Sequence, residues 1–204
     1  MIDKWEELAD DNTIGKTIAA LKTNGIDAIV VESSKQAKEK VLEIIPQGVE
    51  LMNMSSTTLD EIGLTEAIMN SGKFNPVRKK LMSMDRKIQS AEMNKLGAAP
   101  EWTTGSVHAV TEDGKVLIAS NTGSQLSAYA YGSSKIIWVV GTQKIVKNFD
   151  DGIKRIYEHS LKLEDARARK AYGTPSGINK LLIFEKEIIP NRIKLIFVKE
   201  KLGF

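Results

Sequence analysis

The sequence predicts an α/β fold built on a mostly parallel sheet. Short apolar runs rich in valine and isoleucine recur along the 204 residues, and longer stretches with helical spacing separate them. That alternation is typical of parallel strands joined by helices that cover the sheet. A chain of this length can bury a hydrophobic core without disulfides or a structural metal. Because no linker, internal repeat or low-complexity tract divides the sequence, we expect residues 1–204 to form a single domain.

The first half of the sequence alternates between helix and strand patterns. Residues 13–24 predict a helix, and residues 26–31 predict the compact, valine-rich strand that follows it. Residues 33–45 predict a second helix, and residues 49–54 are typical of another strand. Residues 65–97 are helical and strongly charged, but their pattern does not show where the individual helices begin and end.

The second half contains a predicted hairpin and a buried strand. Residues 107–111 and 115–119 form two strand patterns around Asp113-Gly114, a dipeptide typical of a type I′ turn. Residues 136–140 are apolar throughout and predict a buried strand. Further helices are predicted from the loop at residues 121–125 through Tyr131, over residues 149–160 and over residues 164–173, and residues 181–187 and 192–199 are expected to form a terminal hairpin or strand pair.

Composition excludes several classes of function. The sequence has 29 Lys and Arg against 26 Asp and Glu, a net charge of +3, and the two signs alternate along the chain. Nucleic acid is therefore not the expected partner. The sequence has no cysteine, which excludes thiolate nucleophiles, thiolate zinc sites and cysteine-ligated iron–sulfur clusters. The two histidines, His108 and His159, lack any metal-binding spacing, so we expect no metal site.

The opening residues and the apolar runs bear on localisation. Residues 1–7 carry acidic side chains where a signal peptide would carry basic ones. The longest apolar runs, such as residues 136–140, are far shorter than the roughly 20 residues of a membrane-spanning helix. We therefore expect a cytoplasmic protein that has no membrane partner.

Three loops that follow predicted strands share hydroxyl, amide and glycine residues. In an open parallel sheet the ligand crevice lies beyond the carboxyl ends of the strands, where backbone N–H groups and hydroxyls favour an anion. Ordinary helix caps and strand-end turns use the same residue types and are the alternative interpretation. The candidate ligand contacts are Ser55, Ser56, Thr57 and Thr58 in the first loop, Asn121, Thr122, Gly123, Ser124 and Gln125 in the second, and Thr142 and Lys144 in the third.

Two further residues are candidates for chemistry. Glu112, in Glu112-Asp113-Gly114, would supply a carboxylate for general-base or covalent work, and a solvent-exposed hairpin turn is the alternative. His108 is a candidate ligand contact, with a packed, hydrogen-bonded strand histidine as the alternative. The sequence lacks the glycine-rich motifs of dinucleotide and P-loop sites, so it names no cofactor.

Three segments together carry a family resemblance. They are residues 55–64, residues 105–132 and residues 138–146. In this order they resemble the LUD domain family, whose best-known members are the C-type proteins of bacterial lactate utilisation, and the match covers nearly everything from Val49 onward. The resemblance implies a three-layer α/β/α fold similar to sugar-phosphate isomerases and CoA transferases. In that broader group a Glu-x-Gly pattern can lie in the active site, which implies a role for Glu112.

The expected function is binding of a small anion at the carboxyl edge of the sheet, as an accessory in the utilisation of lactate or a related organic acid. The ligand classes are an organic acid, a phosphate ester or a CoA ester. One alternative is an enzyme that isomerises a sugar phosphate or transfers an acyl or CoA group using Glu112. A ligand sensor or assembly subunit without catalysis is the other alternative. A redox protein partner and a homo-oligomer stay open, because the sequence does not decide them.

We predict that the isolated protein does not oxidise lactate. Removing two electrons from a 2-hydroxy acid needs an acceptor that ordinary side chains do not provide. The measurement is the reduction of an artificial electron acceptor by purified protein and lactate, with and without added flavin or nicotinamide. Steady reduction above a heat-denatured control would contradict the prediction.

Overall fold

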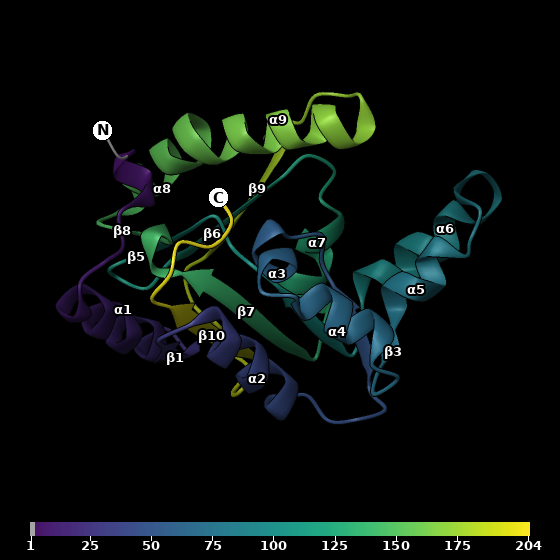
Figure 1. The fold of residues 1–204 in the computed structure, drawn as a ribbon, viewed down its shortest axis with the longest axis horizontal. Coiled ribbons are helices and arrows are strands. Elements are labelled where there is room, and N and C mark those ends of the chain that lie inside the picture. The colour runs from purple at the N-terminus through teal and green to yellow at the C-terminus, as the bar shows by residue number, and fades with distance from the viewer. Residues whose placement is uncertain (1–2) are drawn as a thin grey trace.

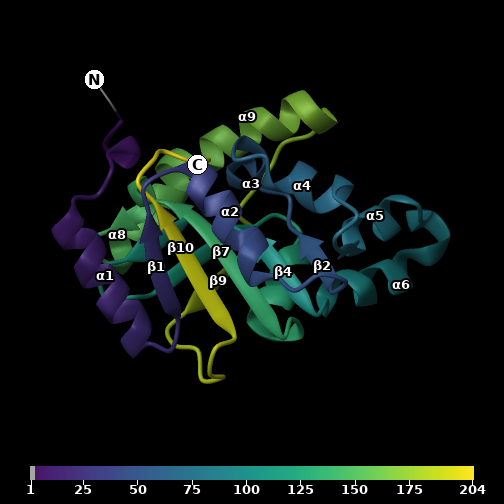
Figure 2. The same ribbon diagram turned by 60° about the horizontal axis from the view of Figure 1, so that its bottom comes forward.

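Two β-sheets lie against each other in the computed structural model, which describes residues 3–204 (Figure 1). The larger sheet has six parallel strands in the order β1-β10-β7-β4-β2-β3, and Figure 2 shows β1, β10, β7, β4 and β2 side by side in that order. Its strands are β1 (Asp27–Val31), β2 (Glu50–Asn53), β3 (Asn75–Pro76), β4 (Trp102–Gly105), β7 (Lys135–Gly141) and β10 (Ile193–Val198). The smaller sheet, in the order β8-β5-β6-β9, is formed by β5 (Ala109–Thr111), β6 (Val116–Ser120), β8 (Ile145–Val146) and β9 (Lys180–Phe184).

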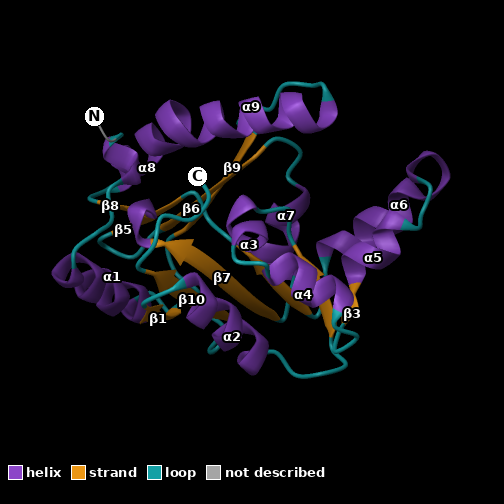
Figure 3. Cartoon of the chain, viewed as in Figure 1, coloured by secondary structure: helices purple, strands orange, loops and turns teal. Residues whose placement is uncertain are grey.

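Helices cover the outer sides of this pair of sheets (Figure 3). Within residues 3–204, no helix combines the length and apolar character needed to cross a membrane. The α-helices are α1 (Asp11–Thr23), α2 (Ser34–Ile44), α3 (Thr57–Glu61), α4 (Leu64–Asn70), α5 (Val77–Met82), α6 (Arg86–Ala98), α7 (Ser124–Ser127), α8 (Phe149–Arg155) and α9 (Leu161–Tyr172). Two short 3₁₀ segments, η1 (Lys4–Glu6) and η3 (Thr142–Lys144), and two π turns, η2 (Ala128–Gly132) and η4 (Ile156–Ser160), complete the elements.

The central strands β7 and β10 are buried on both faces. In β10, Leu195 packs in the core between the two sheets, whereas Ile196 packs on the opposite face with α2, α3 and α4. In β7, Trp138 likewise packs between the two sheets, whereas Val139 packs on the opposite face. Strands enclosed on both sides have continuous rather than alternating apolar sequences, which is why residues 136–140 predict a buried strand correctly.

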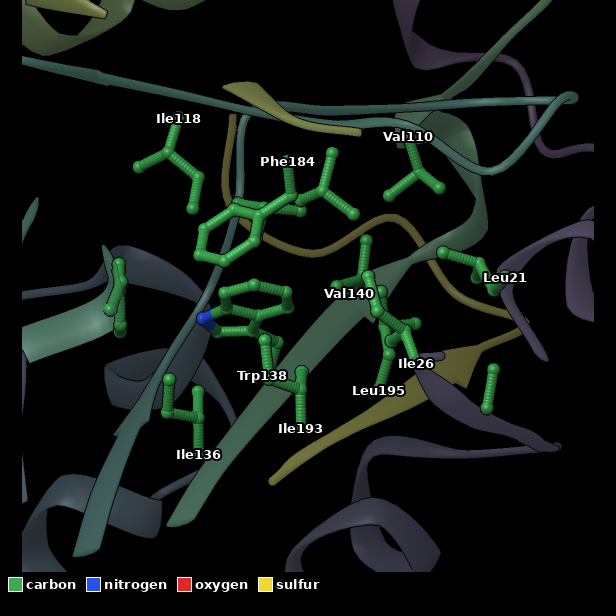
Figure 4. Packing of buried hydrophobic residues seen from close by; sticks show 14 of the residues in the cluster. Leu21, Ile26, Val110, Ile118, Ile136, Trp138, Val140, Phe184, Ile193 and Leu195 are labelled. Carbon is green, nitrogen blue, oxygen red and sulfur yellow. The ribbon is translucent and has the colours of Figure 1, made fainter. Parts of the chain in front are cut away.

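Aromatic side chains fill the space between the sheets (Figure 4). The indole of Trp138 on β7 meets the ring of Phe184 on β9 edge to face, at 5.2 Å between centroids. Tyr129 in η2 makes a second edge contact with Trp138 at 5.5 Å. Such contacts contribute about 0.5–1.5 kcal/mol each beyond the burial of apolar area. The smaller sheet is covered on its other side by α8 and η4, where Leu117 and Ile156 pack together.

The predicted α/β class and mostly parallel sheet are confirmed. The helices predicted over residues 13–24 and 33–45 are α1 and α2, whose starts are capped by Asp10 and Ser33. The strands predicted at residues 26–31, 49–54 and 136–140 are β1, β2 and β7. The predicted helical segment at residues 65–97 divides into α4, α5 and α6, of which α5 and α6 project away from the sheets (Figure 3).

The predicted hairpin is confirmed, but its turn is not type I′. β5 and β6 pair antiparallel, and Gly114 N–H donates to the Thr111 carbonyl oxygen at 2.8 Å. Gly114 has a φ of +84°, whereas Asp113 does not lie in the left-handed region that type I′ requires. A Cβ on Gly114 would lie 2.7 Å from the Ala20 carbonyl carbon of α1. Glycine therefore permits both the turn and its close approach to α1.

The prediction that the last two strands pair with each other is wrong. β9 pairs antiparallel with β6, whereas β10 lies between β1 and β7 in the larger sheet. Burial explains the difference, because Leu181 of β9 is 37% exposed at a sheet edge and residues 195–198 of β10 are fully enclosed. The short strands β3, β4 and β8 were not predicted, since they carry few apolar residues or only two residues each.

We predict that Leu195→Ala lowers the free energy of unfolding by about 2–5 kcal/mol, because it leaves a cavity in the core between the sheets. Chemical denaturation measures this change. Leu163→Ala on α9, where the side chain is 40% exposed, is the matched control and should change it by no more than about 0.5 kcal/mol. Equal effects of the two variants would contradict the central position of β10.

Candidate functional site

A cavity of about 350 Å³ lies at the carboxyl ends of the larger sheet's strands. The segments after β2, β4 and β7 form one part of its wall, and the end of β6 forms another. Residues from η4, α9 and the loop after α9 close the remaining side. Its volume suits a small metabolite.

The first two predicted loops line this cavity, together with Lys144 from the third. Ser56 also caps α3, accepting a hydrogen bond from Leu59 N–H at 3.4 Å, so the alternative interpretation as a helix cap holds for that side chain. Gly123 and Ser124 do not contact the cavity, and Thr142 is fully buried away from it with no hydrogen-bond partner for Oγ1. The predicted residues that do line it are Ser55, Ser56, Thr57, Thr58, His108, Asn121, Thr122, Gln125 and Lys144.

Lys144 holds a buried amine at the cavity. Its side chain is 2% exposed, and Nζ donates to Thr58 Oγ1 and Ser106 Oγ, both at 3.2 Å. Among residues 3–204, no carboxylate lies within ion-pairing distance of Nζ. Burial lowers the pKa of Lys144 well below its ordinary value of 10.5, Arg155 lowers it further, and the more distant Glu61 partly offsets both.

Arg155 is a second buried cation behind the cavity wall. Its guanidinium donates to the backbone carbonyl of His108, to Ser160 Oγ at 3.1 Å and to the Trp5 carbonyl at 3.5 Å. Burial lowers the pKa of Arg155 to about 10, which leaves it charged at neutral pH. It therefore adds positive potential beside Lys144 and fixes the backbone at His108.

His108 presents a neutral hydrogen-bond donor to the cavity. Its Nδ1 accepts from the Ala119 backbone N–H at 3.1 Å, so the ring proton is assigned to Nε2. Burial, with the charges of Lys144 and Arg155, lowers the pKa of His108 to about 3. The imidazole is thus uncharged throughout the physiological pH range, and Nε2–H is its available donor.

Both π turns contribute to the wall. Tyr129 of η2 and Ile156 and Ser160 of η4 line the cavity. A π turn widens a helix locally and is frequently found at functional sites. Gly105 makes room for Tyr129, since a Cβ there would lie only 1.7 Å from the tyrosine hydroxyl.

Several lining residues were not predicted from the sequence. Arg167 on α9 makes a double hydrogen bond to Glu164 at 2.7 and 2.8 Å, so both residues are engaged with each other at the rim. Asp60 accepts from Thr65 Oγ1 at 2.6 Å, and Arg78 enters from α5. Ser106 and Arg155 were also missed, because only the folded chain brings them to Lys144 and His108. Within residues 3–204, no three His, Asp or Glu side chains gather as a metal site requires.

Glu112 does not share the cavity with these residues. It lies in the β5–β6 turn and pairs with Lys16 of α1 at 2.7 Å, with its side chain 24% exposed. The turn and the loop at residues 121–125 flank opposite ends of β6, about 16 Å apart for a strand of this length. The expectation that Glu112 faces the same pocket as the two loops is therefore corrected.

One protein-family model matches most of the chain. A model described as LUD domain matches residues 14–198, including both sheets. The chain belongs to the LUD domain family. The match begins well before Val49, so this LUD-domain chain carries the family pattern over α1, β1 and α2 as well. No curated protein is detectably similar to it.

Solved structures support the fold. A DUF162 family protein from Deinococcus radiodurans is 11% identical, with a TM-score of 0.57 over 94% of this chain and 99% of that chain. At that identity the likeness concerns the fold alone. Ribose 5-phosphate isomerase from Plasmodium falciparum is a weaker match, at 16% identity and a TM-score of 0.35 over 78% and 80% of the two chains, and a score this low establishes no shared fold.

We predict that Lys144→Met does not destabilise the ligand-free protein at neutral pH. The pKa of Lys144 is depressed in the folded state, so between that pKa and 10.5 the unfolded chain binds a proton that the folded chain lacks. Wild-type stability therefore rises with pH across this window, and removing the amine removes that dependence. Melting temperatures from neutral pH to pH 10 measure it. A large loss of stability in Lys144→Met at every pH would contradict the prediction.

Proposed function

We propose that this LUD-domain protein is a cytoplasmic accessory in the utilisation of lactate or a related organic acid, and that it binds a small carboxylate or phosphate anion in the cavity. The observation that carries the proposal is Lys144, a buried amine with hydroxyl partners and no paired carboxylate. The oxidation of the organic acid is then left to a separate redox protein partner.

An anion would offset the cost of the positive charge on Arg155 and of protonating the buried Lys144 amine. Lys144 and Arg155 are both enclosed, and their hydrogen bonds go to hydroxyls and carbonyls rather than to carboxylates. A buried charge without an opposite charge is strongly unfavourable. A bound anion in contact with Lys144 would supply that charge and would raise its pKa towards the ordinary value.

Neutral donors around Lys144 would complete the anion site. His108 offers Nε2–H and Ser106 offers a hydroxyl group that already contacts Nζ. The Thr58 hydroxyl instead donates to the Leu202 carbonyl oxygen at 3.3 Å. Ser55 and Thr57 add hydroxyls from the loop after β2. Neutral donors bind carboxylate and phosphate oxygens without adding further charge that must be desolvated.

The position of Glu112 favours binding over isomerase or transferase chemistry in this cavity. A reaction that needs a side-chain carboxylate as its base would have to use Asp60 or Glu164, the two acidic side chains that line the cavity within residues 3–204. Both already accept hydrogen bonds, from Thr65 and Arg167 respectively. The resemblance to C-type lactate-utilisation proteins supports an organic acid as the ligand.

We predict that lactate and inorganic phosphate bind with about tenfold lower affinity to Lys144→Met than to the wild type, because a hydrogen-bonded charge contact is lost. Affinity for the wild type should increase as the pH falls through the depressed pKa of Lys144, with Arg155 and Glu61 as its charged neighbours and His108 still neutral. Isothermal titration calorimetry in two buffers of different ionisation enthalpy measures both the affinity and the proton uptake.

The matched control is Lys147→Met, three residues further along the chain, where the lysine is exposed. It removes the same charge outside the cavity and should leave the affinity unchanged. Equal affinity in wild type and Lys144→Met would show that the anion does not use the cavity amine.

A further inference from the structure

Lys144 differs from the other lysines in its surroundings. Lys115 and Lys199 each lie within 3.0 Å of a carboxylate oxygen, and these ion pairs favour the protonated amine. The Lys144 amine instead lies between the hydroxyls of Thr58 and Ser106 and close to the cation Arg155. Desolvation and a neighbouring cation are the two devices that produce a neutral, nucleophilic lysine.

We propose that Lys144 forms an imine with the carbonyl carbon of a small 2-oxo acid bound in the cavity. This inference rests on the proposed function, because the anion site there would hold the carboxylate of the same ligand. The amine, the two hydroxyls and the Nε2–H donor of His108 then face one ligand that carries both a carbonyl and a carboxylate.

The step is a condensation with no change of oxidation state. The nitrogen lone pair of Lys144 attacks the carbonyl carbon, and the carbonyl oxygen takes up a proton to give a carbinolamine. The two protons of the neutral amine and the carbonyl oxygen leave together as water, and a carbon–nitrogen double bond remains. The hydroxyl of Ser106, at 3.2 Å from Nζ, is placed to pass protons between nitrogen and oxygen.

The adjacent carboxylate makes a 2-oxo acid a better fit than a simple aldehyde or ketone. Once protonated, the imine restores a positive charge at the buried Nζ position, where no carboxylate of residues 3–204 is within ion-pairing distance. The ligand's own carboxylate would then lie beside that charge and compensate it. A 2-hydroxy acid such as lactate has the same carboxylate group but a hydroxyl in place of the ketone, so it binds without condensing.

Reductive trapping tests the proposal. Wild-type protein is incubated with pyruvate and sodium cyanoborohydride, and intact mass and peptide mapping identify the modified lysine. We expect one adduct per chain, on Lys144, whereas lactate with the same reductant gives none. Lys144→Met should lose that adduct, and the exposed Lys147 serves as an internal control for unselective reaction.

A measurement without any variant covers the case in which Lys144→Met fails to fold. Excess lactate should slow trapping of wild-type protein by pyruvate, because both occupy one cavity. Modification of Lys147 at the rate of Lys144 overturns the imine proposal. Calorimetric binding of pyruvate without an adduct overturns it while the anion site stands, and the absence of both binding and adduct overturns the imine and the proposed function together.

Discussion

The chain crosses from one sheet to the other within a single short segment, and the cavity depends on that crossing. β7 lies at the centre of the larger sheet, η3 follows it directly, and β8 then joins the edge of the smaller sheet beside β5. Lys144 is the last residue of η3 and therefore lies where the two sheets diverge. The hydrogen bonds of both sheets fix the backbone on either side of it, so the amine is held in place with little freedom.

The hydrogen bonds around Lys144 stabilise its amine in the buried position. Buried cations are stable only if their donors find partners. The terminal nitrogens of Arg155 find carbonyls and a hydroxyl, although its Nε has no partner, and Lys144 finds the hydroxyls of Thr58 and Ser106. Neither set of partners carries an opposite charge, so the ligand-free protein bears the cost of burying Arg155 and of lowering the pKa of Lys144. A site of this kind exchanges stability for affinity, which is a common relation at functional sites.

Much of the fold could be predicted because its signals are local. The valine and isoleucine runs identify β1 and β7, and capping residues such as Ser33 mark where helices begin. β4 escaped prediction because Thr103 and Thr104 are buried without being apolar. The position of β10 also escaped, since strand order depends on contacts between distant parts of the chain rather than on any pattern inside the strand.

The candidate site, like the fold, could be predicted where its signals are local and not where it depends on contacts between distant residues. The loops containing Thr58, Asn121 and Lys144 could be predicted, because each follows a strand and is rich in polar donors. Arg155 could not, since its helical pattern gives no sign that its guanidinium reaches His108, 47 residues earlier in the chain. Glu112 was misplaced because a motif specifies residue types but not the end of the hairpin at which they lie.

Because both π turns contribute to the cavity wall, the shape of the wall depends on the exact number of residues in each turn. Each accommodates one residue more than an α-helical turn would, and each places side chains on the cavity. Loss of one residue from η4 would let α8 run into α9 with regular spacing, and the residues of α9 would rotate by about 100° around the axis. Glu164 and Arg167 would then leave the wall. Single-residue insertions and deletions here are thus a route by which related chains could reshape the cavity without altering either sheet.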